Sequence, residues 1–177
     1  MYICKTKFEN ALNRGPQSSF FITMFKEKVE SLLNNALSER PDLFLIDFEI
    51  KLDNSIEVVI DGDEGVLVED CIAISRAIEH NLDRDEEDFS LQVSSAGASS
   101  PLTIPRQYKK NIGRQLEVKT ESNESYVGTL IETNDDSIKL QWKTREPKPV
   151  GKGKVTVTKE KIIEYKNIAK AIIKLKF

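Results

Sequence analysis

The sequence predicts an α+β protein with an N-terminal α-β-β-α-β domain, two helices on a small three-stranded sheet, followed by a small SH3-like or Sm-like β-barrel. Three observations support this. Apolar residues recur at helical spacing twice in the first half of the chain. The second half alternates between apolar and polar residues at period two. The formal charge changes sign between the two halves.

In the first half, a stretch with apolar residues at helical spacing precedes a pair of strands and another follows it. Pro41 ends the first helix, and Asp53 and Asn54 are the turn residues between the first two strands. The second helix buries a stripe that includes Cys71. The expected elements are a helix over 20–39, strands over 43–51 and 55–61, a helix over 67–83, and a strand that ends the stretch 83–94.

The second half is predicted to be all β. Turn residues separate its alternating segments, and Gly128 lies inside one of them as an expected bend or bulge. Short strands in this number and spacing are typical of a small curved barrel. The expected strands cover residues 114–121, 125–133, 136–143, 153–165 and 169–177.

Composition bounds the class of protein. A chain of 177 residues suffices for one medium domain or two small ones. It has no run of eighteen apolar residues, and its N-terminus does not resemble a secretory signal. Two cysteines cannot build a disulfide framework, so we expect a reducing, cytoplasmic setting.

The charge distribution predicts domain boundaries and different partners for the two halves. Residues 24–103 hold six basic and nineteen acidic residues, a net charge of −13, whereas residues 104–177 hold seventeen and nine, a net charge of +8. Residues 1–23 form an N-terminal extension of net charge +2, interpreted as a disordered tail, an added helix or an upstream start-site assignment. The basic half suits nucleic-acid phosphates and the acidic half a basic protein; two merely solvated surfaces are the alternative.

The sequence does not predict an enzyme. It lacks phosphate-binding glycine loops, serine nucleophile elbows and zinc-ligand spacings. His80 is interpreted as a surface residue near a helix C-terminus, and Cys71 as a core residue. The acidic loop over 61–65 is interpreted as a turn, because it lacks the spaced acids of a calcium loop. We therefore expect no catalytic residue, no cofactor and no metal.

Two basic stretches are candidates for RNA binding. Each combines cations with an aromatic residue, Tyr108 in the first and Trp142 in the second. The alternative for the cations is an interdomain connector and a solvated hairpin loop. Trp142 itself is interpreted as a core residue. The candidate RNA-binding residues are Arg106, Lys109, Lys110, Arg114, Lys143, Arg145, Lys148, Lys152 and Lys154.

A run of small residues over 94–101 lies between the two halves. It suits either a linker or a surface that a partner approaches closely, because small side chains allow backbone contact. The candidate partner-binding residues of this loop are Ser94, Ser95, Gly97, Ser99 and Ser100.

These features together resemble the bacterial ribosome maturation factor RimP family over about 150 residues of the 177. The order and spacing of several short motifs support the resemblance. They are Ile60–Asp61, Gly65–Val66, Asp70–Cys71, Ser75–Arg76, Leu82–Asp83, the run Val93 to Gly97, Ile112–Gly113–Arg114 and Gly128–Thr129–Leu130.

The resemblance implies a non-enzymatic ribosome assembly factor with an α/β domain and an SH3-like barrel. It also implies binding to the free small ribosomal subunit, near a basic ribosomal protein of the decoding region and ribosomal RNA, and a role in late maturation. We expect the protein to act as a monomer. A stand-alone Sm-like RNA-binding module is the first alternative, and an enzyme the second.

The chain departs from the family pattern at the small-residue loop. The family usually has an acid and an arginine where this chain has Ser99 and Ser100. We therefore expect the loop to act as a shaped hinge, and Gly97→Val to weaken subunit binding more than Ser100→Ala. Met24 resembles the usual family start, which leaves residues 1–23 as an addition.

Overall fold

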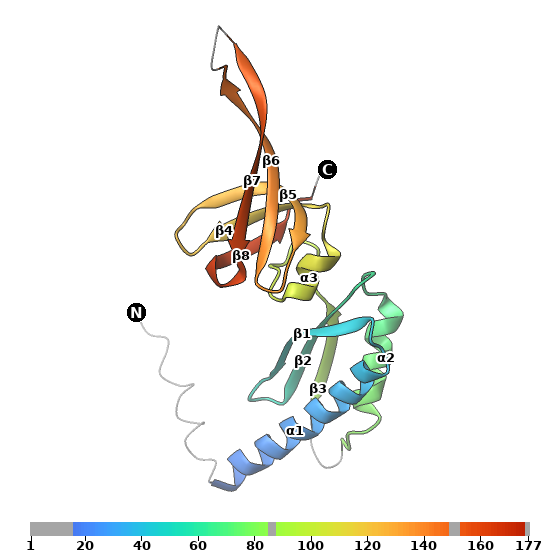
Figure 1. The fold of residues 1–177 in the computed structure, drawn as a ribbon. Helices are drawn as coiled ribbons and strands as arrows, with labels where there is room; N and C mark the ends of the chain where they lie inside the picture. The colour runs from blue at the N-terminus through green and yellow to red at the C-terminus, as the bar shows by residue number, and fades with distance from the viewer. Residues whose placement is uncertain (1–15, 85–87, 149–152, 176–177) are drawn as a thin grey trace, which may run out of the picture.

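The structure is a computed structural model that describes residues 16–84, 88–148 and 153–175 (Figure 1). It confirms the α+β class, with a three-stranded and a five-stranded sheet. The elements are α1 (Pro16–Ser38), β1 (Leu43–Ile50), β2 (Ser55–Gly62), α2 (Val68–Glu79), β3 (Ser90–Ser95), α3 (Pro105–Lys110), β4 (Gln115–Thr120), β5 (Ser125–Thr133), β6 (Ser137–Pro147), β7 (Lys154–Glu164), a 3-10 turn (Tyr165–Asn167) and β8 (Ile168–Ile173).

The first sheet has the order β1-β2-β3 and carries α1 and α2. β1 and β2 form an antiparallel hairpin, and α2 connects β2 to β3, which runs parallel to it. The apolar stripes of the two helices meet the buried side chains of β2 in one core. Val29, Leu33, Ile60 and Ile78 are each no more than 1% exposed in that core.

α1 begins earlier than the sequence predicts. It starts at Pro16. Proline fits this position because backbone N–H groups in the first turn of a helix have no acceptor within the helix, so the N–H that proline lacks is not needed. The start lies within the segment 1–23 that was expected to be an extension. Residues 1–15 of that segment lie outside the described residues.

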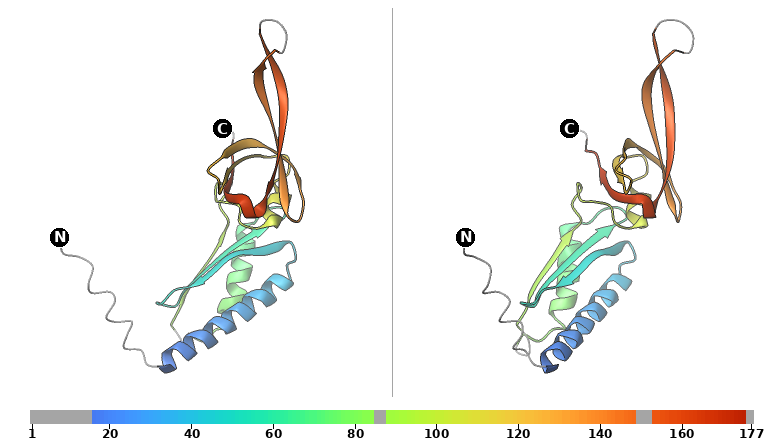
Figure 2. Two further views of the ribbon diagram at one scale, coloured as in Figure 1. Left: turned by 60° about the vertical axis from the view of Figure 1, so that its left-hand side comes forward. Right: turned by 90° about the vertical axis from the view of Figure 1, so that its left-hand side faces the viewer.

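The second sheet is antiparallel, with the strand order β7-β6-β5-β4-β8. The sheet is curved (Figure 2). It encloses a second core, in which Leu116, Leu130 and Leu140 are fully buried. Within the described residues β7 and β8 do not pair with each other, so the sheet is open and the expected closed barrel is not seen.

Gly128 is needed for close packing rather than for the predicted bulge. A side-chain Cβ at Gly128 would lie 3.0 Å from the carbonyl oxygen of Gln141 on the neighbouring strand. The irregularity in the pairing of β5 with β6 lies further along, between Leu130 and Glu132.

β6 is longer than predicted, ending at Pro147 rather than at residue 143, whereas β7 keeps its predicted extent to within one residue at each end. The register of the β6–β7 hairpin runs without a shift from Ser137 opposite Glu164 to Pro147 opposite Lys154. Because β5 pairs with β6 only as far as Gln141, the outer part is a two-stranded ribbon that extends away from the sheet (Figures 1 and 2). We call residues 142–147 and 154–159 the projecting ribbon.

α3 is a short helix within the first basic stretch, for which the sequence predicted no helix or strand. Pro105 occupies its first turn, and Tyr108 is buried in the second core at 3% exposure. The Tyr108 hydroxyl donates to the Leu102 carbonyl at 3.2 Å, and its ring meets that of Tyr165 edge-on. α3 therefore belongs to the second core, yet it lies next to the first sheet (Figure 1).

Candidate functional site

The small-residue loop leads directly from one sheet to the other. Ser94 and Ser95 end β3, where they pair with Val59 and Ile60. A turn follows, in which the Ser100 backbone N–H donates to the Gly97 carbonyl at 2.8 Å. Ser95, Gly97 and Ser99 are exposed, and Ser94 and Ser100 are half-buried. At Leu102 the backbone N–H donates to Ala171 of β8, so the chain has entered the second sheet.

A buried carboxylate at the end of β2 joins the two halves. Asp61 is 6% exposed and accepts hydrogen bonds from the Gln107 side chain at 3.1 Å and from the Gly62 backbone N–H at 2.9 Å. It also forms an ion pair with Lys110, whose ammonium group donates to the Gly62 carbonyl at 3.0 Å. Burial strengthens these bonds, because little water competes for the charged groups.

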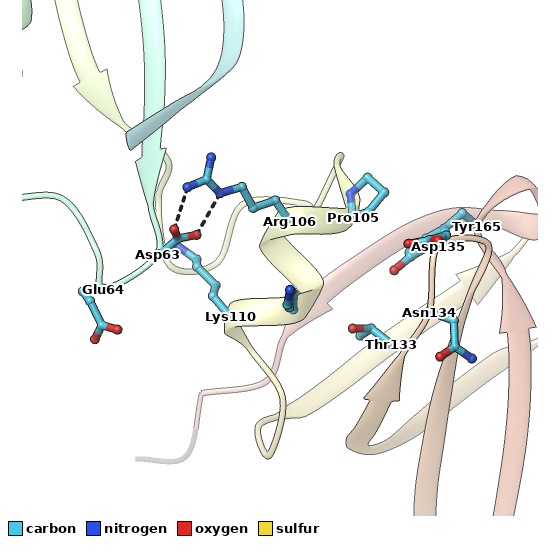
Figure 3. A pocket seen from close by; sticks show the side chains of 10 residues that line it. Asp63, Glu64, Pro105, Arg106, Lys110, Thr133, Asn134, Asp135 and Tyr165 are labelled. Atoms are coloured by element: carbon cyan, nitrogen blue, oxygen red, sulfur yellow. Dashed lines mark hydrogen bonds and ion pairs between the residues drawn. The ribbon is translucent and has the colours of Figure 1, made fainter. Parts of the chain in front are cut away.

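A second ion pair lies beside the first. The guanidinium group of Arg106 donates to both oxygens of Asp63, at 2.8 and 2.6 Å (Figure 3). It also donates to the Pro41 carbonyl at 2.6 Å. It also stacks 4.5 Å from the ring centre of Phe44. The hydrogen bonds from Arg106 hold the pKa of the Asp63 carboxyl below its ordinary value of 3.8. Arg106 thus fixes α3 against both the end of β2 and the start of β1.

An open groove of about 780 Å³ adjoins these ion pairs (Figure 3). Carboxylates and cations both line it, so it has no single charge. The lining residues are Asp63, Glu64, Pro105, Arg106, Lys109, Lys110, Thr133, Asn134, Asp135 and Tyr165. This mixture, with two of the cations already paired, does not define a pocket for one small ligand.

The candidate RNA-binding residues lie in two regions, around α3 and on the β6–β7 hairpin. Two of the described ones are paired with carboxylates, and the others are exposed. Arg106 and Lys110 have intramolecular carboxylate partners, and the Lys110 side chain is only 17% exposed. Lys109 and Arg114, on and after α3, are exposed. The remaining described members belong to the outer part of the β6–β7 hairpin, which extends away from α3 in Figure 1, and are exposed; they are Lys143, Arg145, Lys148 and Lys154. Lys152 lies outside the described residues.

The residues that were interpreted as structural keep that role. Cys71 packs against the first core, and burial raises the pKa of its thiol. Trp142 packs against the second core beside Tyr126, as predicted. His80 is exposed at the C-terminus of α2. Among the described residues, no group of three or more metal-ligating side chains is close enough to hold an ion. None of the described helices is long and apolar enough to cross a membrane.

Sequence reasoning missed the acceptors of the interdomain contact. Asp61 and Asp63 were interpreted as turn residues, and Phe44 and Gln107 were not singled out. One signal was available: an Asp-Gly pair at the end of a buried strand, with a second Asp following it. It could not identify a partner, because Arg106 lies 43 residues away from Asp63 along the chain.

The two sheets, each with its own core, and the contact between them define a two-part α+β protein. The family model described as "RimP N-terminal domain" matches residues 33–99. Ribosome maturation factor RimP of Christiangramia forsetii is 58% identical over 154 residues, which cover 87% of this chain and 100% of that protein.

Two further relatives extend the comparison. Ribosome maturation factor RimP of Flavobacterium psychrophilum is 52% identical over 84% of this chain and 96% of its own length. The factor of the same name from Porphyromonas gingivalis is 35% identical over 83% of this chain and 96% of its own length. The chain therefore belongs to the RimP family, and the resemblance seen in the sequence is confirmed.

Proposed function

We propose that the protein is a ribosome assembly factor that binds the free small ribosomal subunit and aids its late maturation. The observation that carries the proposal is the match to the Christiangramia factor, 58% identical over that protein's whole length. The role is one of binding, without a catalytic step, and we place it in the cytoplasm with the protein acting as a monomer.

The two halves would serve different partners. We assign the acidic domain, residues 24–103, to a basic ribosomal protein of the decoding region, because its net charge is −13. We assign the basic domain, residues 104–177, to ribosomal RNA, because its net charge is +8. The strand order β8-β4-β5-β6-β7 supports an SH3-like, Sm-like assignment for this second domain, since its last strand pairs with its first.

The exposed cations are the better RNA contacts. Lys109, Arg114, Lys143, Arg145, Lys148 and Lys154 are exposed to solvent. Arg106 and Lys110 instead bind Asp63 and Asp61, so we propose that they set the arrangement of the domains. The loop with Ser94, Ser95, Gly97, Ser99 and Ser100 remains a proposed partner-binding segment next to that contact.

Co-sedimentation tests the proposal. The purified protein is mixed with free small subunits, free large subunits and mature ribosomes over a salt series. We expect selective binding to the free small subunit that persists at physiological salt. Equal binding to all three particles, lost at moderate salt, would indicate a generic basic surface and contradict the proposal.

The charge of the second half favours one alternative, an Sm-like module that binds RNA on its own. This alternative predicts that naked ribosomal RNA competes fully with the small subunit for the protein, with a steep dependence on salt. The assembly-factor proposal predicts incomplete competition, because the acidic domain would still contact ribosomal protein.

A further inference from the structure

The projecting ribbon has two faces of different chemistry. Side chains alternate between faces along each strand, and the uninterrupted register fixes which residues share a face. The face that continues the core side of the sheet carries Trp142, Thr144, Glu146, Val155, Val157 and Lys159. The opposite face, which we call the cationic face, carries Lys143, Arg145, Pro147, Lys154, Thr156 and Thr158.

Unpaired positive charge gathers on the cationic face. Lys143, Arg145 and Lys154 are exposed, and none of them has an ion pair with another described residue. The nearest carboxylate along this face is Glu160, which Lys139 and Gln141 already bind, each at 2.8 Å. The face therefore presents three cations and two threonine hydroxyls without a carboxylate among them.

The other face uses its cations internally. Lys159 forms an ion pair with Glu146, and Lys161 lies 5.5 Å from the ring centre of Tyr126. Val155 and Val157 give this face an apolar character in the outer part of the ribbon. A basic composition alone does not require free and paired cations to lie on different faces. The seventeen basic residues in this half could lie on either face.

The cationic face lacks an aromatic side chain among its described residues. Trp142 points to the core side, where its ring centre is 5.9 Å from that of Tyr126. Surfaces that bind single-stranded RNA combine positive charge with aromatic rings on which bases stack. Double-helical RNA is recognised instead through phosphates and 2′-hydroxyls, which need cations and hydroxyl groups. Lys143, Arg145, Thr156 and Thr158 supply these groups.

The shape of the ribbon suits the same ligand. Six residues in each strand extend roughly 17–20 Å, at about 3.3 Å per residue. A two-stranded ribbon is narrow enough to enter a nucleic-acid groove, and the minor groove of A-form RNA is wide and shallow. We propose that the cationic face of the projecting ribbon binds double-helical RNA across its phosphates and 2′-hydroxyls. The inference rests on the proposed function and names the class of RNA that the basic domain contacts.

Fluorescence anisotropy on the full chain tests this proposal. The probes are a labelled RNA hairpin of about 20 base pairs, a single-stranded RNA of the same composition and a DNA duplex of the same sequence. The hairpin is longer than the ~16 base pairs that a double-stranded RNA domain spans. Lys143→Gln/Arg145→Gln removes two charges from the cationic face. Lys159→Gln/Lys161→Gln removes two charges from the same hairpin on the other face, and is the matched control.

We expect the first variant to bind the RNA hairpin at least tenfold more weakly at physiological salt, and the control less than threefold. The slope of log K against log salt should fall by about 1.8 in the first variant, since each phosphate contact contributes about 0.9. Urea unfolding checks that both variants fold. Arg145→Gln alone replaces the double variant if that one is unstable.

The outcomes separate this proposal from the proposed function. Equal affinities of the two double variants for the RNA hairpin, or tighter binding of the single-stranded RNA, would overturn the ribbon proposal. In that case, selective co-sedimentation with small subunits would still support the assembly role. Conversely, a wild-type protein that binds the RNA hairpin through the cationic face but fails to bind small subunits would overturn the proposed function alone.

Discussion

Asp61 is the more buried of the two carboxylates that bind α3, the other being Asp63. It is 6% exposed and is bound by Lys110 and Gln107, both from α3. Removing its charge leaves a largely buried ammonium group without a counterion, which is costly in a low-dielectric site. We predict that Asp61→Asn lowers the free energy of unfolding by about 1–3 kcal/mol, measured by urea denaturation.

A double-mutant cycle identifies the cause of that loss. With Lys110→Met already in place, Asp61→Asn should cost less than it does alone, because the buried cation is gone. Asp135→Asn, at an exposed position in the same groove, is the matched control and should change stability by no more than about 0.5 kcal/mol. Equal costs of Asp61→Asn with and without Lys110 would show that the ion pair does not carry the effect.

Asp63 makes the second ion pair dependent on pH. Hydrogen bonds from Arg106 hold the Asp63 pKa below its ordinary value of 3.8 in the folded protein. A lowered folded-state pKa means that the stabilisation is fully present above 3.8 and is lost as the pH falls through the folded value. We predict an Asp63 titration midpoint below 3.8 by NMR, which moves up toward 3.8 in Arg106→Gln. An unchanged midpoint in that variant would contradict the pairing.

At the scale of elements, the turn after β2 holds the acceptors in place. The Gly65 backbone N–H donates to the Gly62 carbonyl at 3.1 Å, and a Cβ at Gly62 would lie 2.3 Å from the Gly65 carbonyl oxygen. We predict that Gly62→Ala destabilises the protein by about 1–3 kcal/mol, because the backbone has to move away. Gly97→Ala is the control. Its Cβ would meet only the Ser100 hydroxyl, which can rotate away, so urea unfolding should detect little change.

The elements that could be predicted from the sequence are those that bury one face. The stripe that includes Val29 and Leu33 predicts α1, and the alternation of Leu116 with Val118 predicts β4, because apolar spacing reports directly on burial. α3 was missed because its six residues are too few to show a period. The outer part of β6 was missed because residues 143–147 hold no apolar residue, whereas Val155 and Val157 of the facing strand alternate with threonines.

The candidate site was predictable in composition but not in arrangement. The sequence identifies Arg106, Lys110, Lys143 and Arg145 as one kind of residue, since all four are cations in a basic half. Only the fold separates them, by bringing Asp61 and Asp63 to α3 and leaving the ribbon cations in solvent. A charge seen in sequence does not reveal whether its counterion is a solvent ion, a ligand or a distant carboxylate.

At the scale of the whole molecule, α3 couples two separately packed cores. Each sheet has its own hydrophobic cluster, and the chain passes between them through the exposed loop around Gly97. Domains joined by small polar contacts are expected to move relative to each other unless specific bonds hold them. Here those bonds come from Arg106, Gln107 and Lys110 on a single short helix.

Breaking these bonds should loosen the arrangement without unfolding either core. We predict that Arg106→Gln/Lys110→Met increases the radius of gyration in small-angle X-ray scattering. The matched variant Lys109→Gln/Arg114→Gln removes the same charge from exposed neighbours and should leave the radius unchanged. An unchanged radius in the first variant would mean that the loop alone holds the two halves together.

Under the proposed function, the affinity for the small subunit reports whether a fixed arrangement of the two halves matters for binding. If the subunit contacts both halves at once, a loosened protein binds only through the fraction of molecules that have the competent arrangement. We expect Arg106→Gln/Lys110→Met to weaken binding by roughly tenfold, which corresponds to a competent fraction of about one tenth. Lys109→Gln/Arg114→Gln would weaken it through lost phosphate contacts, with a lower salt slope, whereas loosening changes the affinity and leaves that slope nearly constant. A salt slope that falls equally in both variants would show that Arg106 and Lys110 contact RNA directly, and that their ion pairs with Asp63 and Asp61 give way on the ribosome.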